Sequence, residues 1–334
     1  MALTGMQKPD HRTVNLFRQR HLKALSELFG QVLRLCEKAG LIKLGHVALD
    51  GTRIRANASK QKSMSYRTMK RAEDQLKAEV ERWFREAERI DREEDKRYGA
   101  DKSGDELPEW VSNKQERLKR IRQAKAELEA EAKAEAERGR DPNKTGHKPK
   151  PTGTPAEKTQ RNLTDSESRL MKSGDQFVQG YNAQAAVDSY RQIIVAQGLT
   201  NSGSDMHQMI PLIKQIRVNL KRQAKEMSAD SGYCSQLNLK ALNRHHIRGY
   251  VSTRSHHKHR RVGPWVQQMR QRLQQGARRS RYRLRKQVVE PVFGQIKHGR
   301  GFRQFLLRGI KKVSAEWSLL CTAHNLLKLS AAKA

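Results

Sequence analysis

Apolar and polar residues follow two different periods along this chain, and the periods predict its helices and strands. Over residues 11–39, apolar side chains recur at steps of three and four, which predicts a helix. Over residues 41–56 they alternate with polar ones, as is typical of a half-buried strand. Gly40 lies between the two segments. The chain is therefore expected to begin with a helix and to continue into one or two strands.

The middle of the chain changes in composition to Glu, Lys, Arg and Ala. Between residues 60 and 139, apolar residues recur at alternating steps of four and three on both sides of a turn at 101–108. This heptad-like pattern predicts two helices, and the short connection between them predicts that they pack antiparallel. The tract 140–158 is rich in Lys, Pro, Thr and Gly, which is typical of a flexible basic linker.

The remainder of the chain alternates between the two periods. Asp188 is expected in a turn between strands, and Ser204 or Asp205 is expected to cap a helix. The whole order predicts an α/β fold, a mixed sheet flanked by helices, with the helical hairpin inserted after the first core strand. Strand patterns occupy 181–187, 192–199, 226–230 and 247–253, and helix patterns occupy 206–220, 234–245, 288–296 and 313–329.

These patterns divide the chain into five segments. A helical amino-terminal region is followed by the first strands of a core, an inserted helical hairpin, a flexible basic linker and the rest of the core, which includes a basic loop. In that order the expected boundaries are 1–40, 41–60, 61–139, 140–162 and 163–334, with the basic loop at 253–286.

The charge balance points to a nucleic-acid partner. Lys and Arg number 68 against 35 Asp and Glu, for a formal net charge of +33, and such a surplus is typical of proteins that hold phosphate backbones. No apolar run is long enough for a membrane span, and the chain does not start with a secretory signal. The three cysteines form no Cys-x-x-Cys pair, which argues against a disulfide framework. We expect a cytoplasmic, nucleoid-associated protein with neither a membrane partner nor a small-molecule substrate.

Three acidic residues stand beside apolar ones in this basic chain: Asp50, Asp230 and Glu290. Burying a carboxylate there is costly unless a cation is supplied. Carboxylates that hold two Mg²⁺ or Mn²⁺ ions inside a phosphate-binding surface can carry out phosphoryl transfer. The alternative interpretation, solvated side chains at element ends, stays open. Asp188 and Asp205 compete with Asp230, but their expected places favour structural roles.

The neighbourhoods of these acids resemble a known family. Asp50 lies in Leu-Asp-Gly-Thr-Arg-Ile, Asp230 lies in Ala-Asp-Ser-Gly-Tyr, and Glu290 begins the run Glu-Pro-Val-Phe-Gly-Gln-Ile-Lys. Together with the tail that follows, these motifs resemble the DDE transposases of bacterial insertion sequences, in the branch with a Tyr-Arg-Glu-Lys signature. The resemblance implies a ribonuclease-H-like core and dependence on Mg²⁺ or Mn²⁺. It also implies that the three acids are the catalytic, metal-binding residues.

The resemblance assigns the other signature positions to residues that contact DNA. Tyr282, Arg285 and Lys297 would fill them, and six residues separate Glu290 from Lys297, as the pattern requires. On a regular helix this spacing places the two side chains two turns apart on one face. Four residues separate Arg285 from Glu290 where the pattern has three, so Lys286 stands at the expected spacing and is also a candidate. Arg53, which follows Asp50 on the predicted strand, is a further candidate for holding the DNA backbone.

The function that this resemblance implies is cleavage and strand transfer at the ends of an insertion sequence. The partners would be double-stranded DNA at the element ends and the target, with self-association on DNA. Only about forty residues precede the Asp50 strand, so we also expect an amino-terminally shortened chain. The alternative is therefore a catalytically inactive, truncated DNA-binding protein that is a remnant or an inhibitor of a full-length transposase.

Overall fold

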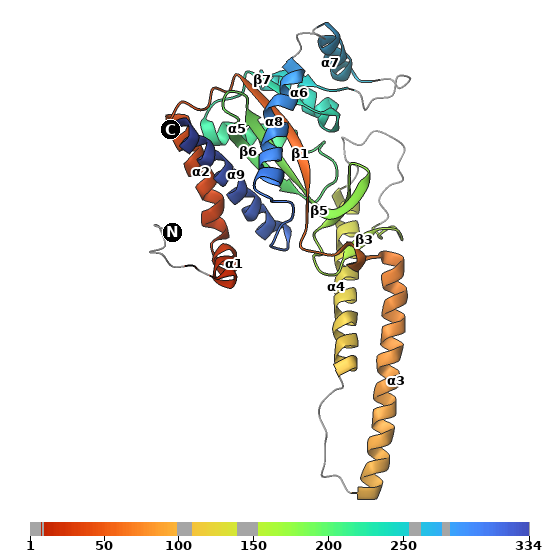
Figure 1. Ribbon diagram of the computed structural model, residues 1–334. Coiled ribbons are helices and arrows are strands. Elements are labelled where there is room, and N and C mark those ends of the chain that lie inside the picture. Colours follow the sequence, from red (N-terminus) through yellow and green to blue (C-terminus); the bar gives the residue numbers. More distant parts are fainter. Residues whose placement is uncertain are drawn as a thin grey trace. The chain divides into compact units, whose positions relative to one another are not determined.

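The computed structural model describes residue 8 and residues 10–98, 109–138, 153–253, 262–275 and 281–333. The chain divides into two compact units. The first consists of Met1–Ala58 and Glu167–Ala334, and the second of Ser59–Ser166. The first unit contains a mixed sheet covered by helices, and the second contains two long helices (Figure 1).

A six-stranded sheet forms the centre of the first unit, in the order β4-β5-β1-β7-β8, with β6 also paired to β5. β5 runs antiparallel to β1, β4 and β6, whereas β7 runs parallel to β1 and β8. The predicted mixed sheet is thus confirmed, although β4 was not predicted. The strands are β1 (His46–Arg55), β4 (Arg169–Ser173), β5 (Gln176–Asp188), β6 (Ile194–Thr200), β7 (Glu226–Ala229) and β8 (Arg248–Val251).

The helices of the first unit follow the predicted order with three local differences. The helix predicted over 11–39 is broken at His21, whose φ of −110° and ψ of 31° leave the helical region. Part of the expected basic loop forms the helix α7. The helix α8, which contains Glu290, continues into a π-helical turn, η5. The helices are α1 (His11–Arg20), α2 (Leu22–Lys38), α5 (Met209–Leu220), α6 (Gln236–Arg244), α7 (Pro264–Gln275), α8 (Leu284–Gly294) and α9 (Ile310–Lys333), with the short turns η3 (Ser231–Tyr233), η4 (Arg281–Arg283) and η5 (Gln295–Gly299).

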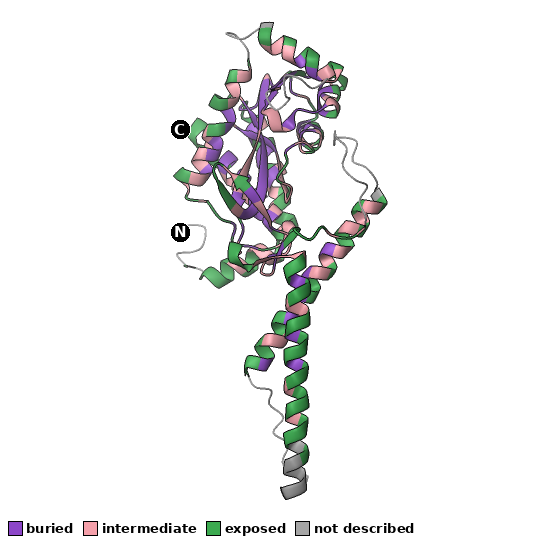
Figure 2. Cartoon of the chain, turned by 90° about the vertical axis from the view of Figure 1, so that its right-hand side faces the viewer, coloured by how far each residue is buried: buried purple, intermediate pink, exposed green. Residues whose placement is uncertain are grey.

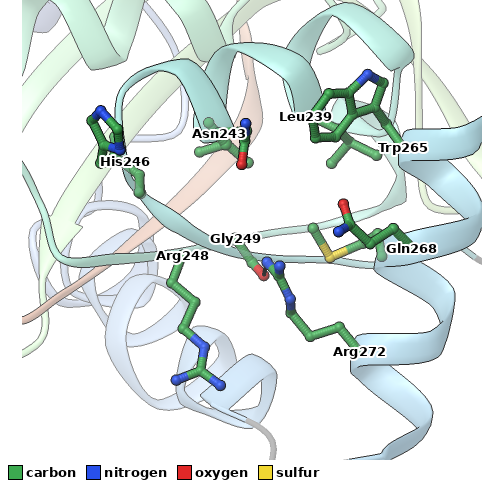
Figure 3. Close-up of a pocket in the computed structure, with 11 residues that line it drawn as sticks. Leu239, Asn243, His246, Arg248, Gly249, Trp265, Gln268 and Arg272 are labelled. Carbon is green, nitrogen blue, oxygen red and sulfur yellow. Dashed lines mark hydrogen bonds between the residues drawn. The ribbon is translucent and has the colours of Figure 1, made fainter.

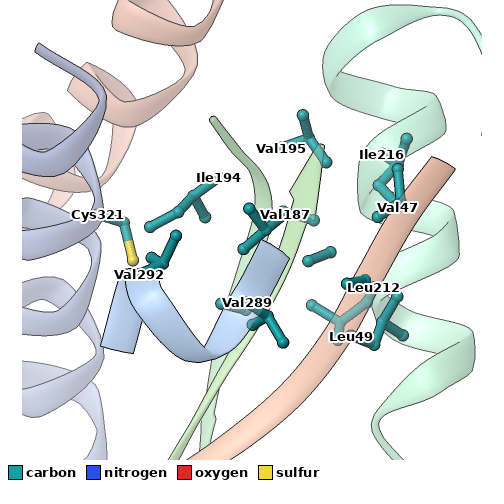
Figure 4. Packing of buried hydrophobic residues seen from close by; sticks show 14 of the residues in the cluster. Val47, Leu49, Val187, Ile194, Val195, Leu212, Ile216, Val289, Val292 and Cys321 are labelled. Carbon is teal, nitrogen blue, oxygen red and sulfur yellow. The ribbon is translucent and has the colours of Figure 1, made fainter. Parts of the chain in front are cut away.

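The hydrophobic core lies on both faces of the sheet. Successive residues of a strand point to opposite faces, so Ile194 and Val195 of β6 enter different layers. Figure 4 shows Ile194 on the side of Cys321 from α9 and Val195 on the side of Ile216 from α5. All four side chains are buried. The sheet is therefore packed by helices on both faces, which fixes the positions of its strands, including β1 with Asp50.

The second unit is a helical hairpin with a two-stranded sheet at its base. Glu73 on α3 pairs with Arg122 and Lys125 on α4, and Glu79 pairs with Lys114, so the two helices run antiparallel. Its core is small, and most of the hairpin surface is exposed (Figure 2). The elements are η2 (Lys60–Lys62), β2 (Ser63–Ser65), α3 (Tyr66–Tyr98), α4 (Glu109–Arg138) and β3 (Gln160–Asn162).

Four predicted segments lie partly outside the described residues. Residues 1–7 and 9 of the amino-terminal region are outside them, as are residues 99–108 and 139 of the hairpin, which include the turn predicted at 101–108. Of the linker expected over 140–162, residues 140–152 are outside them, and residues 160–162 form β3 rather than flexible chain. Of the basic loop expected over 253–286, residues 254–261 and 276–280 are outside them. Among the helices that the structure describes, none combines the length and the apolar character that crossing a membrane requires.

Candidate active site

The strand register brings the first two acids to one place. β1 and β7 are parallel, and Ala48 pairs with Ser228. Two residues further along each chain, Asp50 is level with Asp230, immediately after the end of β7. Because β1 continues to Arg55, its central residues extend beyond its shorter neighbour. Asp50 thus lies in mid-strand on β1, and Asp230 lies at a strand end.

Both carboxylates are fixed by backbone donors and carry unfavourable charge. Oδ1 of Asp50 accepts a hydrogen bond from the amide of Gly51 at 2.9 Å, and Oδ1 of Asp230 accepts one from Gly232 at 2.9 Å. Burial raises the pKa of Asp50 to about 6, and the negative charges of Asp230 and Asp205 add to the effect. Burial and the charge of Asp205 also raise the pKa of Asp230. Such shifts are typical of sites that gather like charges for a cation.

Arg285 joins the first acid to the third. Its Nη1 donates to Oδ2 of Asp50 at 2.7 Å, and its Nη2 donates to Oε1 of Glu290 at 3.2 Å. The side chains of Arg285 and Asp50 are 13 % and 16 % exposed, whereas that of Glu290 is 46 % exposed. A buried guanidinium therefore lies between two of the three predicted acids, both of which hydrogen-bond to it.

The other signature residues lie on α8 and on the turns at its two ends. Lys297 is on η5, where Nζ donates to the carbonyl of Arg53 at 3.0 Å, and burial lowers its pKa. Because the α-helix ends at Gly294 and becomes a π-turn, the expectation that Lys297 and Glu290 share a face of a regular helix is wrong. Tyr282 is on η4 and half-buried.

The structure separates the two candidates for the signature arginine. Arg285 contacts Asp50 and Glu290, as described above. Lys286, at the spacing that the pattern favours, is exposed. Of the two cations, Arg285 is therefore the one that meets the acids.

Arg53 points away from the Asp50 carboxylate. The two residues are three apart on β1, and alternation along a strand places their side chains on opposite faces. Nη2 of Arg53 donates to the carbonyl of Gly203 at 2.7 Å and lies 3.4 Å from Oδ2 of Asp205. Arg53 is thus held by the segment before α5.

Asp205 belongs to this region although sequence analysis assigned it to a helix end. α5 begins at Met209, Gln208 is its N-cap, and no side chain caps it. The expectation that Asp205 caps that helix is therefore wrong. Its side chain is instead buried near Asp230, whose pKa its charge raises. The misleading signal was an Asp just before a helical pattern, where capping is the common reason for an aspartate.

The donor atoms suit a hard divalent cation, although the arrangement is not a finished metal site. Carboxylate oxygens are the ligands that Mg²⁺ prefers. The raised pKa of Asp50 means that Arg285 leaves much of the negative charge uncompensated. Within the described residues, no three His, Cys, Asp or Glu side chains are grouped closely enough to hold a metal ion. The donor chemistry therefore fits, and the guanidinium of Arg285 lies between Asp50 and Glu290.

A separate pocket lies beside the acids' sheet, between α6, β8 and α7. It has a volume of about 420 Å³, with an apolar floor that includes Leu242 and Met269. Figure 3 shows Trp265 and Gln268 on one side, with Arg272 reaching back toward the carbonyl of Gly249, a contact of 3.3 Å. Part of its lining comes from residues of the predicted basic loop, and none of the three predicted acids lines it.

Comparison with known proteins identifies the family. The family model described as the transposase DDE domain matches residues 147–326. This segment includes Asp230 and Glu290, whereas Asp50 precedes it. No curated protein and no solved structure matches the chain. Since the match covers more than half of the chain and the mixed sheet agrees with it, this protein belongs to the transposases with a DDE domain.

Proposed function

We propose that this protein catalyses metal-dependent cleavage and strand transfer of DNA at the ends of an insertion sequence. The observation that carries the proposal is the pair of hydrogen bonds by which Arg285 joins Asp50 to Glu290, in a chain of the DDE family. The charge of Arg285 interacts with all three acids. Family membership makes DNA the substrate, and the net charge of +33 agrees with it.

The three acids are proposed to hold Mg²⁺ or Mn²⁺. When bound, two such ions would activate the attacking oxygen and stabilise the leaving one. Asp50 and Asp230 supply ligands from adjacent parallel strands, whose packing limits their movement. Glu290 supplies the third ligand from α8, and its greater exposure leaves it room to turn inward. Hydrolysis and strand joining are both in-line displacements at phosphorus, so one site suffices for both.

The cations around the acids are proposed to bind the DNA backbone. Arg285 would leave the acids for a phosphate, with which a guanidinium can form two parallel hydrogen bonds. Lys297 is close enough to meet a neighbouring phosphate because its ammonium already lies against β1. Tyr282, Lys286 and Arg53 are proposed as further contacts. Self-association on DNA is also part of the proposal.

Substitution of each acid tests this function. Asp50→Asn, Asp230→Asn and Glu290→Gln should each abolish Mg²⁺-dependent nicking of DNA that carries the element ends, while DNA binding in a mobility-shift assay persists. Asp188→Asn is a control, because Asp188 is a fully buried aspartate whose carboxylate accepts hydrogen bonds from the amides of Leu44 and Tyr190. Full nicking by any acid variant would remove that residue from the site.

One observation favours a second candidate, a DNA-binding protein without catalysis. Arg285 already neutralises part of the charge on Asp50 and Glu290, as in a site that needs no metal. In that case the wild-type protein would bind end-bearing DNA and leave it intact in both Mg²⁺ and Mn²⁺. Nicking in either metal rejects this candidate.

A further inference from the structure

The carboxylate of Asp205 lies at the centre of a buried polar cluster next to the acids. Its Oδ1 accepts hydrogen bonds from Nδ2 of Asn182 at 2.6 Å and from Nε2 of Gln184 at 2.7 Å. Its Oδ2 faces Nη2 of Arg53 at 3.4 Å. We call Arg53, Asn182, Gln184 and Asp205 the Asp205 cluster. Only 5 % of Asp205 is exposed, so its charge is compensated mainly by these groups and not by water.

The sheet register explains why these side chains meet. In the antiparallel pair of β1 and β5, Arg53 is opposite Asn182 and Gly51 is opposite Gln184. Residues opposite each other in a ladder point to the same face, so all four positions share one face. Asp50 is opposite Ala185 and points to the other face. The Asp205 cluster therefore lies beside Asp50 along β1, but on the opposite face of the strand from the Asp50 side chain.

Asp205 also touches the backbone on which both strand acids depend. A Cβ atom on Gly51 would lie 2.6 Å from Oδ1 of Asp205, and one on Gly232 would lie 3.2 Å from Oδ2. Gly51 follows Asp50 directly, and the amide of Gly232 holds Asp230. Asp205 thus packs against the β1 backbone beside Asp50 and against the turn that follows Asp230, and the two glycines leave room for it.

Neither DNA binding nor helix capping accounts for a charged group here. Asp205 is too buried to meet a phosphate, and its negative charge would repel one. It makes no side-chain cap on α5. Burying a third carboxylate beside Asp50 and Asp230 is costly, because like charges in a low-dielectric interior repel. A cation bound at the site would offset this cost, so the buried charge fits a site that attracts cations.

We propose that Asp205 is a positioning residue of the active site, which packs against the backbone next to Asp50 and Asp230 and whose charge strengthens divalent-metal binding. The inference rests on the proposed function. Arg53 works in the opposite direction, since its positive charge lies against Asp205 and acts on Asp230 as well. The balance between Asp205 and Arg53 therefore sets how strongly the acids attract a metal ion.

Calorimetric titration of the full-length protein with Mn²⁺, without DNA, tests this proposal. Asp205→Asn should weaken Mn²⁺ binding by about 10- to 100-fold, the range for groups that orient metal ligands from behind. Arg53→Gln should tighten it, because it removes a cation and keeps a hydrogen-bond donor. Asp188→Asn is the control, since Asp188 is buried at the other end of the β1–β5 ladder, opposite Val47. Thermal unfolding is measured for all three variants.

The opposite signs separate an electrostatic role from a structural one. If Asp205 and Arg53 only supported the fold, both variants would weaken Mn²⁺ binding in proportion to their loss of stability, as Asp188→Asn would, and the proposal would be overturned. Unchanged Mn²⁺ binding by Asp205→Asn also overturns it, and the proposed function then stands as long as the wild type binds Mn²⁺ and nicks DNA. If Asp205→Asn does not fold, Arg53→Gln decides, and failure to tighten binding counts against the inference. A wild-type protein that neither binds Mn²⁺ nor nicks DNA removes both proposals.

Discussion

The guanidinium of Arg285 donates a hydrogen bond to the carboxylate of Asp50 over 2.7 Å. Asp50 is on β1 and Arg285 is on α8, so this contact joins two segments that are 235 residues apart in the chain. The same guanidinium holds Glu290, and its Nε is buried without a hydrogen-bond partner among the described residues. A cation that is incompletely bonded and held by two proposed metal ligands competes directly with metal.

Removing this cation should favour metal binding. Arg285→Gln is expected to tighten Mn²⁺ binding in the absence of DNA by about tenfold, which corresponds to about 1.4 kcal/mol. Lys286→Gln, a change of the same charge one residue away on an exposed position, should leave Mn²⁺ affinity unchanged. Calorimetric titration measures both. Equal effects of the two variants would mean that net charge, not the contact with Asp50, controls the affinity.

The charge of Asp50 should make the metal-free protein less stable at neutral pH. Its pKa is raised from the ordinary 3.8 to about 6, so the folded state favours the neutral carboxyl. The stability that the neutral Asp50 carboxyl contributes to the folded state is fully present below about pH 4 and is lost as the pH rises through about 6. Asp50→Asn should therefore raise the free energy of unfolding at pH 7.5, by at most about 3 kcal/mol. Denaturant titrations at pH 7.5 and 4.5 check this, because the gain should shrink at the lower pH.

His324 should act with the opposite sign in the same pH range. It is fully buried, its Nε2 donates to the carbonyl of Gln192 at 2.9 Å, and burial lowers its pKa to about 4. The unfolded chain binds a proton at about pH 6.5, so the stability that neutral His324 contributes is lost as the pH falls from about 6.5 toward 4. His324→Gln should flatten the acid side of the stability curve. An unchanged slope between pH 6.5 and 4.5 would show that another group titrates there.

Local patterns predicted the elements better than the contacts between them. The motif around Asp50 identified a strand and a candidate acid, and the register with β7 then placed that acid beside Asp230. Asp205 was weighed against Asp230 and assigned to a helix end, because its partners, Asn182 and Gln184, lie on β5 and meet it only in the folded sheet. The π-turn that displaces Lys297 was likewise not predicted, because the spacing argument assumed a regular α-helix from Glu290 to Lys297. Long-range pairing decides such positions, and periodicity does not encode it.

The two glycines that flank Gln184 should differ sharply in their tolerance of a methyl group. In the ladder, Gly51 of β1 and Gly198 of β6 are opposite Gln184 on its two sides. A Cβ on Gly51 would lie 2.3 Å from Nε2 of Gln184 and 2.6 Å from Oδ1 of Asp205, whereas a Cβ on Gly198 would make an ordinary contact of 3.9 Å with Cβ of Gln184.

Gly51→Ala must therefore displace the Asp205 cluster or the strand itself. We expect it to lower the free energy of unfolding by about 1–3 kcal/mol, and a shift of Asp50 by about 1 Å would lower nicking by about 100-fold. Gly198→Ala should stay within about 0.5 kcal/mol of the wild type and retain nicking. Thermal unfolding and the nicking assay on both variants provide the comparison. Gly51→Ala changes only a methyl group, which is placed against Asp205 and Gln184. Nicking at the wild-type rate by this variant would therefore mean that the position of Asp50 does not depend on the Asp205 cluster.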